Sequence, residues 1–248
     1  MNISALDLLS KLLSSNPNEA KALIKLVNIE VLKSLGDANY TLLLDGKTLN
    51  AKSDKVLQEG AKYWANLSQQ KAATPQLSSL VKQPVLLKNL APFATYYSPK
   101  DIQTLLVSKE GLNNYKHSLL EQLSNATSKD EFSNISALLL SLHHQVATIA
   151  LNYSGIFSIL QFKKRYNKKT KKVVLDFYAA LEILGPISGI VALSESEVII
   201  ELSVAFEKTK QFLEENMNGI SYDVKISLLD NIEPLFVPKE SSLLDISI

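Results

Sequence analysis

Apolar residues near the start of the chain recur with the spacing of a helix. These residues are Ile3, Leu6, Leu9, Leu12 and Leu13. Their spacing predicts an amphipathic helix over residues 3–14. Asn16 followed by Pro17 predicts the start of a second helix that reaches about Leu26, because proline is tolerated in a first helical turn.

From residue 29 the apolar positions change to the pattern of short strands. We predict strands over residues 29–34, 40–44, 48–51 and 63–67, separated by Gly36-Asp37, Asp45-Gly46 and Glu59-Gly60. An Asp-Gly pair between apolar runs predicts a tight hairpin, because the favoured turn needs positive φ at both central residues. Four or five short strands within roughly 45 residues indicate a small closed or half-closed barrel.

Three aromatic residues of this stretch are candidates for stacking on nucleic acid, as in some small barrels. They are Tyr40, Tyr63 and Trp64, and no run of basic residues surrounds them. We therefore expect Tyr63 and Trp64 to pack the barrel.

Prolines mark the next stretch, and helical spacing returns after it. Pro75, Pro84 and Pro92 resist a long helix, so residues 69–98 are predicted to be a linker. Residues 99–149 carry apolar positions that predict three helices, the last over roughly Lys129–Thr148.

A strongly basic segment lies between two predicted strands, residues 156–162 and 172–179. Seven of the ten residues from 163 to 172 are basic: Lys163, Lys164, Arg165, Lys168, Lys169, Lys171 and Lys172. This pattern predicts a β-hairpin with a basic tip. Three interpretations stay open, namely a solvated loop that keeps the strands soluble, a surface for an acidic protein, and a phosphate-binding loop.

The region from Lys172 to Leu228 is predicted to be a compact α+β unit. Its order is strand, turn, strand, turn, strand, helix and strand, with the helix over Phe206–Met217. The predicted fold class is therefore α+β, with a small barrel, a helical middle segment and a C-terminal sheet with one packed helix. The predicted boundaries are residues 1–68, the linker 69–98, the helices 99–149, the C-terminal domain 150–232 and a tail, 233–248.

Composition narrows the function classes without selecting one. The chain has 248 residues, a net charge of +1 and no cysteine, so it offers no disulfide, no thiolate nucleophile and no overall attraction to nucleic acid. It contains no secretory signal pattern and no apolar run of about 18 residues, which predicts a cytoplasmic protein. The Ser- and Asn-rich start could instead serve as an uncleaved type III export signal.

Residues that could carry catalysis are sparse. The adjacent His143 and His144 would point about 100° apart on a helix, so they cannot both face one metal ion. Residues 185–189, Gly-Pro-Ile-Ser-Gly, lack the Lys-Ser/Thr of a phosphate-binding loop. Glu195 with Glu197, and Glu214 with Glu215, read as solvated surface. We therefore predict no enzyme activity, no catalytic residue, no cofactor and no metal.

The segment from Leu181 to Leu193 resembles the C-terminal domain of flagellar hook-length control proteins. Leu181, Leu184 and Gly185 take the place of that family's Leu…Leu-Gly turn. Ile187, Ile190 and Val191 take the place of its alternating strand, and the helix that follows Val204 fits its single helix. The resemblance covers about a quarter of the chain. The family's long Pro/Gln/Ser-rich N-terminal region is replaced here by the barrel and helices, which indicates a shortened or paralogous relative.

The resemblance implies a motility protein of flagellar type III secretion that binds the export gate's switch protein and controls its change of substrate specificity. A binding surface of this kind acts by favouring one state of its partner. The expected partner-binding residues are Leu181, Leu184, Gly185, Pro186, Ile187 and Val191, with the basic hairpin beside them. The alternative is a nucleic-acid-binding module that uses the barrel and the basic hairpin.

Overall fold

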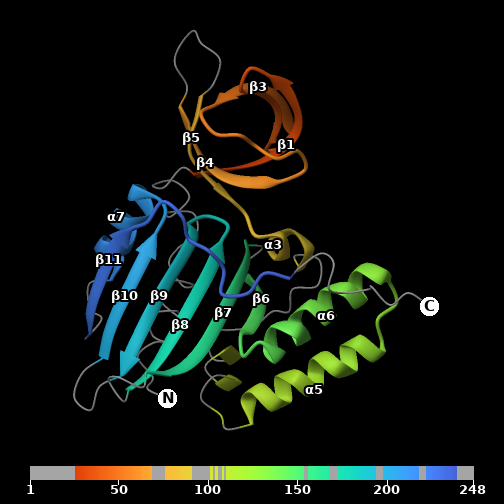
Figure 1. Ribbon diagram of the computed structural model, residues 1–248, viewed down its shortest axis with the longest axis vertical. Coiled ribbons are helices and arrows are strands. Elements are labelled where there is room, and N and C mark those ends of the chain that lie inside the picture. Colours follow the sequence, from red (N-terminus) through yellow and green to blue (C-terminus); the bar gives the residue numbers. More distant parts are fainter. Residues whose placement is uncertain are drawn as a thin grey trace.

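The computed structural model describes most of the chain between residues 26 and 238. The described residues are 26–68, 76–90, 101–102, 104–105, 108, 110–153, 156–167, 172–193, 198–217 and 222–238. They form a five-stranded barrel above a six-stranded sheet, with helices beside the sheet (Figure 1). The helices predicted before residue 26 lie outside the described residues, and Leu26 itself begins the first strand.

The barrel closes with the strand order β1-β2-β3-β5-β4. Its strands are β1 (Leu26–Gly36), β2 (Asn39–Leu44), β3 (Lys47–Ser53), β4 (Lys62–Ser68) and β5 (Gln76–Lys82). The first strand pairs with β4 through its first half and with β2 through its second, and two register shifts interrupt the pairing with β2. A short parallel pair, β3 with β5, completes the closure. This Greek-key arrangement of five strands is that of OB-type barrels.

Local sequence explains two of the barrel's turns. Asp45 and Gly46 both have positive φ, 50° and 75°, so the predicted Asp-Gly hairpin is confirmed. Asp37 and Ala38 adopt the same region between β1 and β2. Two buried tyrosines then fix the longer connection after β3, because the Tyr40 hydroxyl accepts the Leu57 N–H at 3.2 Å and the Tyr63 hydroxyl accepts the Gln58 N–H at 3.0 Å.

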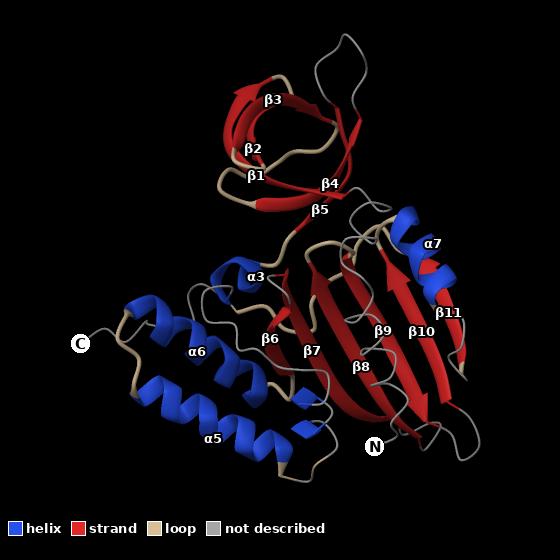
Figure 2. Cartoon of the chain, turned by 180° about the vertical axis from the view of Figure 1, so that it is seen from behind, coloured by secondary structure: helices blue, strands red, loops and turns tan. Residues whose placement is uncertain are grey.

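Among the described residues, the helices between the barrel and the sheet in the sequence include α3 (Val85–Leu90), α5 (Gly111–Ser124) and α6 (Lys129–His143). The two longer helices run side by side near β6 (Figure 2). Ser128 caps α6, since its Oγ accepts the Glu131 N–H at 3.1 Å. The helix ends where Gln145 takes φ 61° and the Val146 N–H bonds the Ser141 carbonyl, a Schellman arrangement. None of the described helices is long and apolar enough to cross a lipid bilayer.

The sheet has the order β11-β10-β9-β8-β7-β6. Its strands are β6 (Ala147–Tyr153), β7 (Ile156–Asn167), β8 (Lys172–Leu181), β9 (Gly185–Leu193), β10 (Val198–Val204) and β11 (Asp223–Leu228). Neighbours are antiparallel except β10 and β11, which are parallel and are joined by α7 (Glu207–Asn216). From β8 onward this is the predicted order of strands and helix. The whole is α+β, as the sequence predicted.

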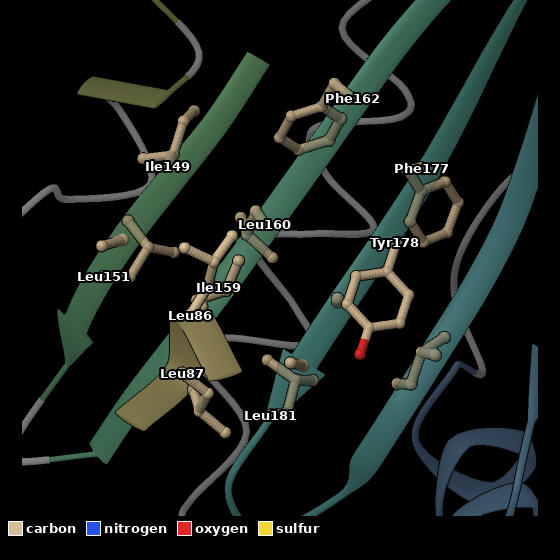
Figure 3. Packing of buried hydrophobic residues seen from close by; sticks show 14 of the residues in the cluster. Leu86, Leu87, Ile149, Leu151, Ile159, Leu160, Phe162, Phe177, Tyr178 and Leu181 are labelled. Carbon is tan, nitrogen blue, oxygen red and sulfur yellow. The ribbon is translucent and has the colours of Figure 1, made fainter. Parts of the chain in front are cut away.

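Both faces of the sheet are covered. Helix α7 lies on one face over β10 and β11 (Figure 2), and residues 229–238, which we call the strap, cross the opposite face (Figure 1). Gln161 holds the strap, because its amide donates to the Phe236 carbonyl at 2.9 Å and accepts the Phe236 N–H at 3.1 Å. The central strands carry a continuous set of buried apolar side chains, and Leu86 and Leu87 of α3 add to it (Figure 3).

Three predicted boundaries differ from the structure. The predicted linker contains β5, the strand that closes the barrel, and also α3. The helix predicted to reach Thr148 ends at His143, and β6 begins at Ala147. The predicted tail includes Phe236, which is buried against the sheet. In each case pairing or burial against distant residues decides the structure of a segment with a weak local pattern.

Candidate partner-binding site

The structure places the six predicted partner-binding residues inside the molecule. Leu181, Leu184, Gly185, Pro186, Ile187 and Val191 are all buried. They belong to the end of β8, the turn after it, the start of β9 and, for Val191, the second half of β9. Gly185 has φ +78°, and a Cβ built on it would lie 2.6 Å from a ring carbon of Phe206. The glycine is needed for the turn to lie against the ring at the start of α7.

The barrel of the same chain covers this turn. The Glu182 carbonyl accepts a hydrogen bond from the Trp64 indole N–H at 3.2 Å and from the Asn28 amide at 3.5 Å. Trp64 is fully buried, and it belongs to the core of the sheet domain, not to that of the barrel. Leu26 also reaches the turn, close to Gly185. The turn is therefore an internal contact between barrel and sheet, and its role toward another protein stays a prediction.

Trp64 shows where the sequence-based expectation about the barrel was only half right. Tyr63 and Ala65 point into the barrel core, and Trp64, between them, points out toward the sheet. Alternation along a strand produces this division, because successive side chains point to opposite faces. The available signal was a run of three apolar residues, Tyr63, Trp64 and Ala65, in a strand of which only every second side chain can enter a barrel.

The basic segment continues β7 and does not form a separate loop from its start. Lys163, Lys164 and Arg165 belong to β7, and Lys172 begins β8, so the predicted hairpin is present with a longer first strand. Lys168, Lys169 and Lys171 lie outside the described residues. The Arg165 Nε lies 2.6 Å from Asp176 Oδ2. This hydrogen bond, together with the negative charge of Asp176, raises the pKa of Arg165 above its ordinary value.

The basic part of β7 has one free edge among the described residues. The pairing of β6 with β7 ends at Ala147 opposite Phe162, so residues 163–167 pair only with β8 in the part of the chain that is described. Lys164 and Tyr166 are exposed, and 59% of Tyr166 is accessible to solvent. An unpaired strand edge with cations and an exposed tyrosine offers backbone hydrogen bonds, charge and apolar area together. We call residues 163–167 the basic edge.

The other titratable groups singled out in the sequence do not assemble into a site. The rings of His143 and His144 have centroids 5.7 Å apart at an interplanar angle of 82°, and His144 contacts Phe236. Glu214 lies 3.8 Å from Lys210 on α7, whereas Glu195 and Glu197 are outside the described residues. No group of three or more His, Asp or Glu side chains suited to a metal ion occurs within the described ranges.

Comparison with known proteins assigns no function to this chain. No protein-family model, curated protein or solved structure matches this chain.

Proposed function

We propose that this chain is a non-enzymatic protein of the flagellar type III export system, similar to hook-length control proteins, that acts by binding the export gate's switch protein. The order from β8 to β11, with one helix before the last strand, supports this proposal because it is the order that the resemblance requires. On this proposal the chain works from the cytoplasmic side, whether or not it is itself exported.

The basic edge is the surface that we assign to the partner, and its exposure is the observation that carries this assignment. The turn after β8 is covered by the barrel, whereas Lys164, Arg165 and Tyr166 are exposed. Asp176 forms its salt bridge with Arg165, and within the described ranges neither Lys163 nor Lys164 takes part in a salt bridge, so one carboxylate is set against three cations in this strand. Such charges increase the rate at which a partner with an acidic surface associates. Tyrosine is also enriched among the residues that contribute most of the binding energy of an interface.

A binding experiment with the purified cytoplasmic domain of an export gate switch protein tests the proposal. The full chain should bind, and the double variant Lys164→Glu with Tyr166→Ala should bind at least tenfold more weakly, because a central tyrosine alone is worth about 2 kcal/mol or more. Lys116→Glu is the matched control, since it makes the same charge change on an exposed position of α5. Equal binding by the double variant would remove the basic edge from the site, and no binding by the full chain would remove the proposed partner.

A second candidate function is binding of single-stranded nucleic acid, and the OB-type strand order of the barrel is the observation that favours it. In such barrels the face of the second and third strands binds the ligand. Here that face exposes Thr48, Asn50 and Lys52, whereas Tyr40, the aromatic residue of these two strands, is turned into the core. Binding would then rest on phosphate contacts, so raising the salt concentration should abolish it, and an apolar protein contact should persist.

A further inference from the structure

A pocket of about 510 Å³ lies where the barrel, the sheet and the strap meet. We call it the junction pocket. Its apolar lining comes from Leu80 and Val81 at the end of β5, from Pro84 and Val85 after it, and from strap residues. The strap contributes Ile232, Pro234 and Val237. Concave sites for small molecules generally have volumes between about 300 and 1,000 Å³ with mainly apolar walls, so this pocket has the size and lining of a ligand site.

Tyr178 places one polar group in this apolar pocket. It lies on the face of β8 that the strap covers, opposite Gln161 of β7 and Ser188 of β9, and only 1% of it is exposed. Its ring lies along the sheet with the hydroxyl at the far end (Figure 3). Among the described residues no hydrogen bond to this hydroxyl occurs, and the hydroxyl is not one of the fully enclosed, unpaired side-chain atoms. Because Tyr178 lines the junction pocket, its hydroxyl is open to a molecule that enters the pocket and can pair with it.

Burial favours the protonated state of the Tyr178 hydroxyl. It raises the pKa of Tyr178 well above the ordinary value for tyrosine, because the phenolate would lose its hydration. The group therefore remains protonated at neutral pH and can donate a hydrogen bond. A ligand that pairs with this proton must present an acceptor next to the Tyr178 hydroxyl.

The charged residues of the lining do not select a charged ligand. Two are cations, Lys55 and Lys82, and two are anions, Asp230 and Glu233. The Lys55 ammonium bonds the Leu80 carbonyl at 3.3 Å, and the Lys82 ammonium bonds Gln58 at 2.6 Å. Glu233 accepts from Asn231 at 2.9 Å. The two cations and two anions of the lining balance in sign, and most of the remaining wall is apolar, where an ionised group would be desolvated at a large cost.

We propose that the junction pocket binds a small, uncharged and largely apolar molecule whose carbonyl oxygen accepts a hydrogen bond from the Tyr178 hydroxyl. The walls supply apolar contact, and Tyr178 supplies the one directional interaction. This site is separate from the basic edge, so the proposal for the pocket does not depend on the proposed export function.

Acetanilide is a suitable probe, because it combines an aromatic ring with a neutral carbonyl acceptor. Benzoate and benzylamine carry the same ring with a negative or a positive charge. Each would be titrated into the full chain and followed by saturation-transfer NMR, with the fluorescence of Trp64 as a second signal. Trp64 is the only tryptophan of the chain and pairs across β4 and β5 with Val81 of the pocket wall. We expect saturable binding of acetanilide and weaker binding of both ions.

Three variants locate the binding. Tyr178→Phe should weaken acetanilide binding roughly 3- to 10-fold, the loss expected for one hydrogen bond. Val237→Trp fills the pocket from an exposed position of its wall and should abolish binding. Tyr166→Phe removes a hydroxyl outside the pocket and should change nothing. The proposal is overturned if acetanilide does not bind, if benzoate or benzylamine binds more tightly, or if Tyr178→Phe binds as well as the natural chain.

Discussion

The barrel and the sheet deal with their strand edges in different ways. Every strand of the barrel pairs with two neighbours, so the barrel has no edge and needs only residues 26–82 to complete its core. The sheet ends in β6 and β11, and its core draws on side chains from Trp64 to Phe236. Closure makes a unit independent of the rest of the chain, whereas an open sheet depends on what covers it. We therefore expect the sheet to be the more vulnerable of the two.

The substitution expected to have the largest effect on this contrast between barrel and sheet is Trp64→Ala. The substitution removes the barrel's one large contribution to the core of the sheet and also the hydrogen bond to Glu182, so we expect a loss of about 3–5 kcal/mol in the free energy of unfolding. Because Trp64 is not in the barrel core, urea unfolding followed by circular dichroism should separate into two transitions. A single transition at the original midpoint would mean that the two parts do not depend on this contact.

Gly185→Ala compares a turn of the sheet with a turn of the barrel. The new Cβ meets Phe206 in a backbone conformation with positive φ, so strain and overpacking should cost about 2–4 kcal/mol. Gly46→Ala is the matched control, because Gly46 has φ +75° but nothing within 4 Å of the added atom. Its cost should be about 1–2 kcal/mol, from strain alone. Equal losses in thermal or urea unfolding would show that Phe206 moves away freely.

Gln161→Leu measures how strongly the sheet depends on its strap. The change keeps a similar volume but leaves the N–H and carbonyl of Phe236 without their partners, which should cost about 1–3 kcal/mol. Hydrogen exchange at the Phe236 amide should accelerate more than exchange in the barrel. Gln122→Leu, on the exposed face of α5, should leave both quantities unchanged. Unaltered protection of Phe236 would show that other contacts hold the strap.

The smallest expected effect is a change in the pH dependence of stability at alkaline pH, and it is caused by Tyr178. Burial raises its pKa in the folded state, so the folded protein holds this proton more tightly than the unfolded chain. The stabilisation is complete below the unfolded pKa of about 10 and is lost as the pH rises above it, by at most about 1.4 kcal/mol per pH unit. Between pH 9 and 11 the free energy of unfolding of Tyr178→Phe should therefore fall less than that of the natural chain, and the difference should be about 1.4 kcal/mol. Identical pH profiles would mean that the hydroxyl is well solvated.

Local sequence signals predicted the parts of the fold that short-range chemistry determines. Asp45-Gly46 encodes its own hairpin, and the strands on either side of the basic segment pair as expected. Strand β5 was missed because its sequence, Gln-Leu-Ser-Ser-Leu-Val-Lys, is too polar to indicate a strand until it pairs with β3 and β4. Strand β6 was missed because α6 ends at His143 and the chain turns at Gln145, a residue type that does not signal the left-handed conformation.

The candidate site was harder to predict, for a physical reason. The apolar pattern from Leu181 to Val191 is the same whether the turn contacts a partner or the chain's own barrel, and only the position of Trp64 decides between them. Tyr178 likewise looks like any core aromatic in the sequence. Its hydroxyl becomes notable only when β5 and the strap enclose it.

The hold of Gln161 on Phe236 also bears on the order in which the protein folds during synthesis. The two residues are 75 positions apart, and Phe236 leaves the ribosome long after the barrel strands have emerged. Domains generally fold as units from the N-terminus as they are made. The barrel can therefore close early, with Trp64 still exposed, while the sheet stays incomplete until Phe236 has been made. During that interval we expect the nascent chain to carry a closed barrel beside an incomplete sheet whose apolar residues are still exposed to solvent.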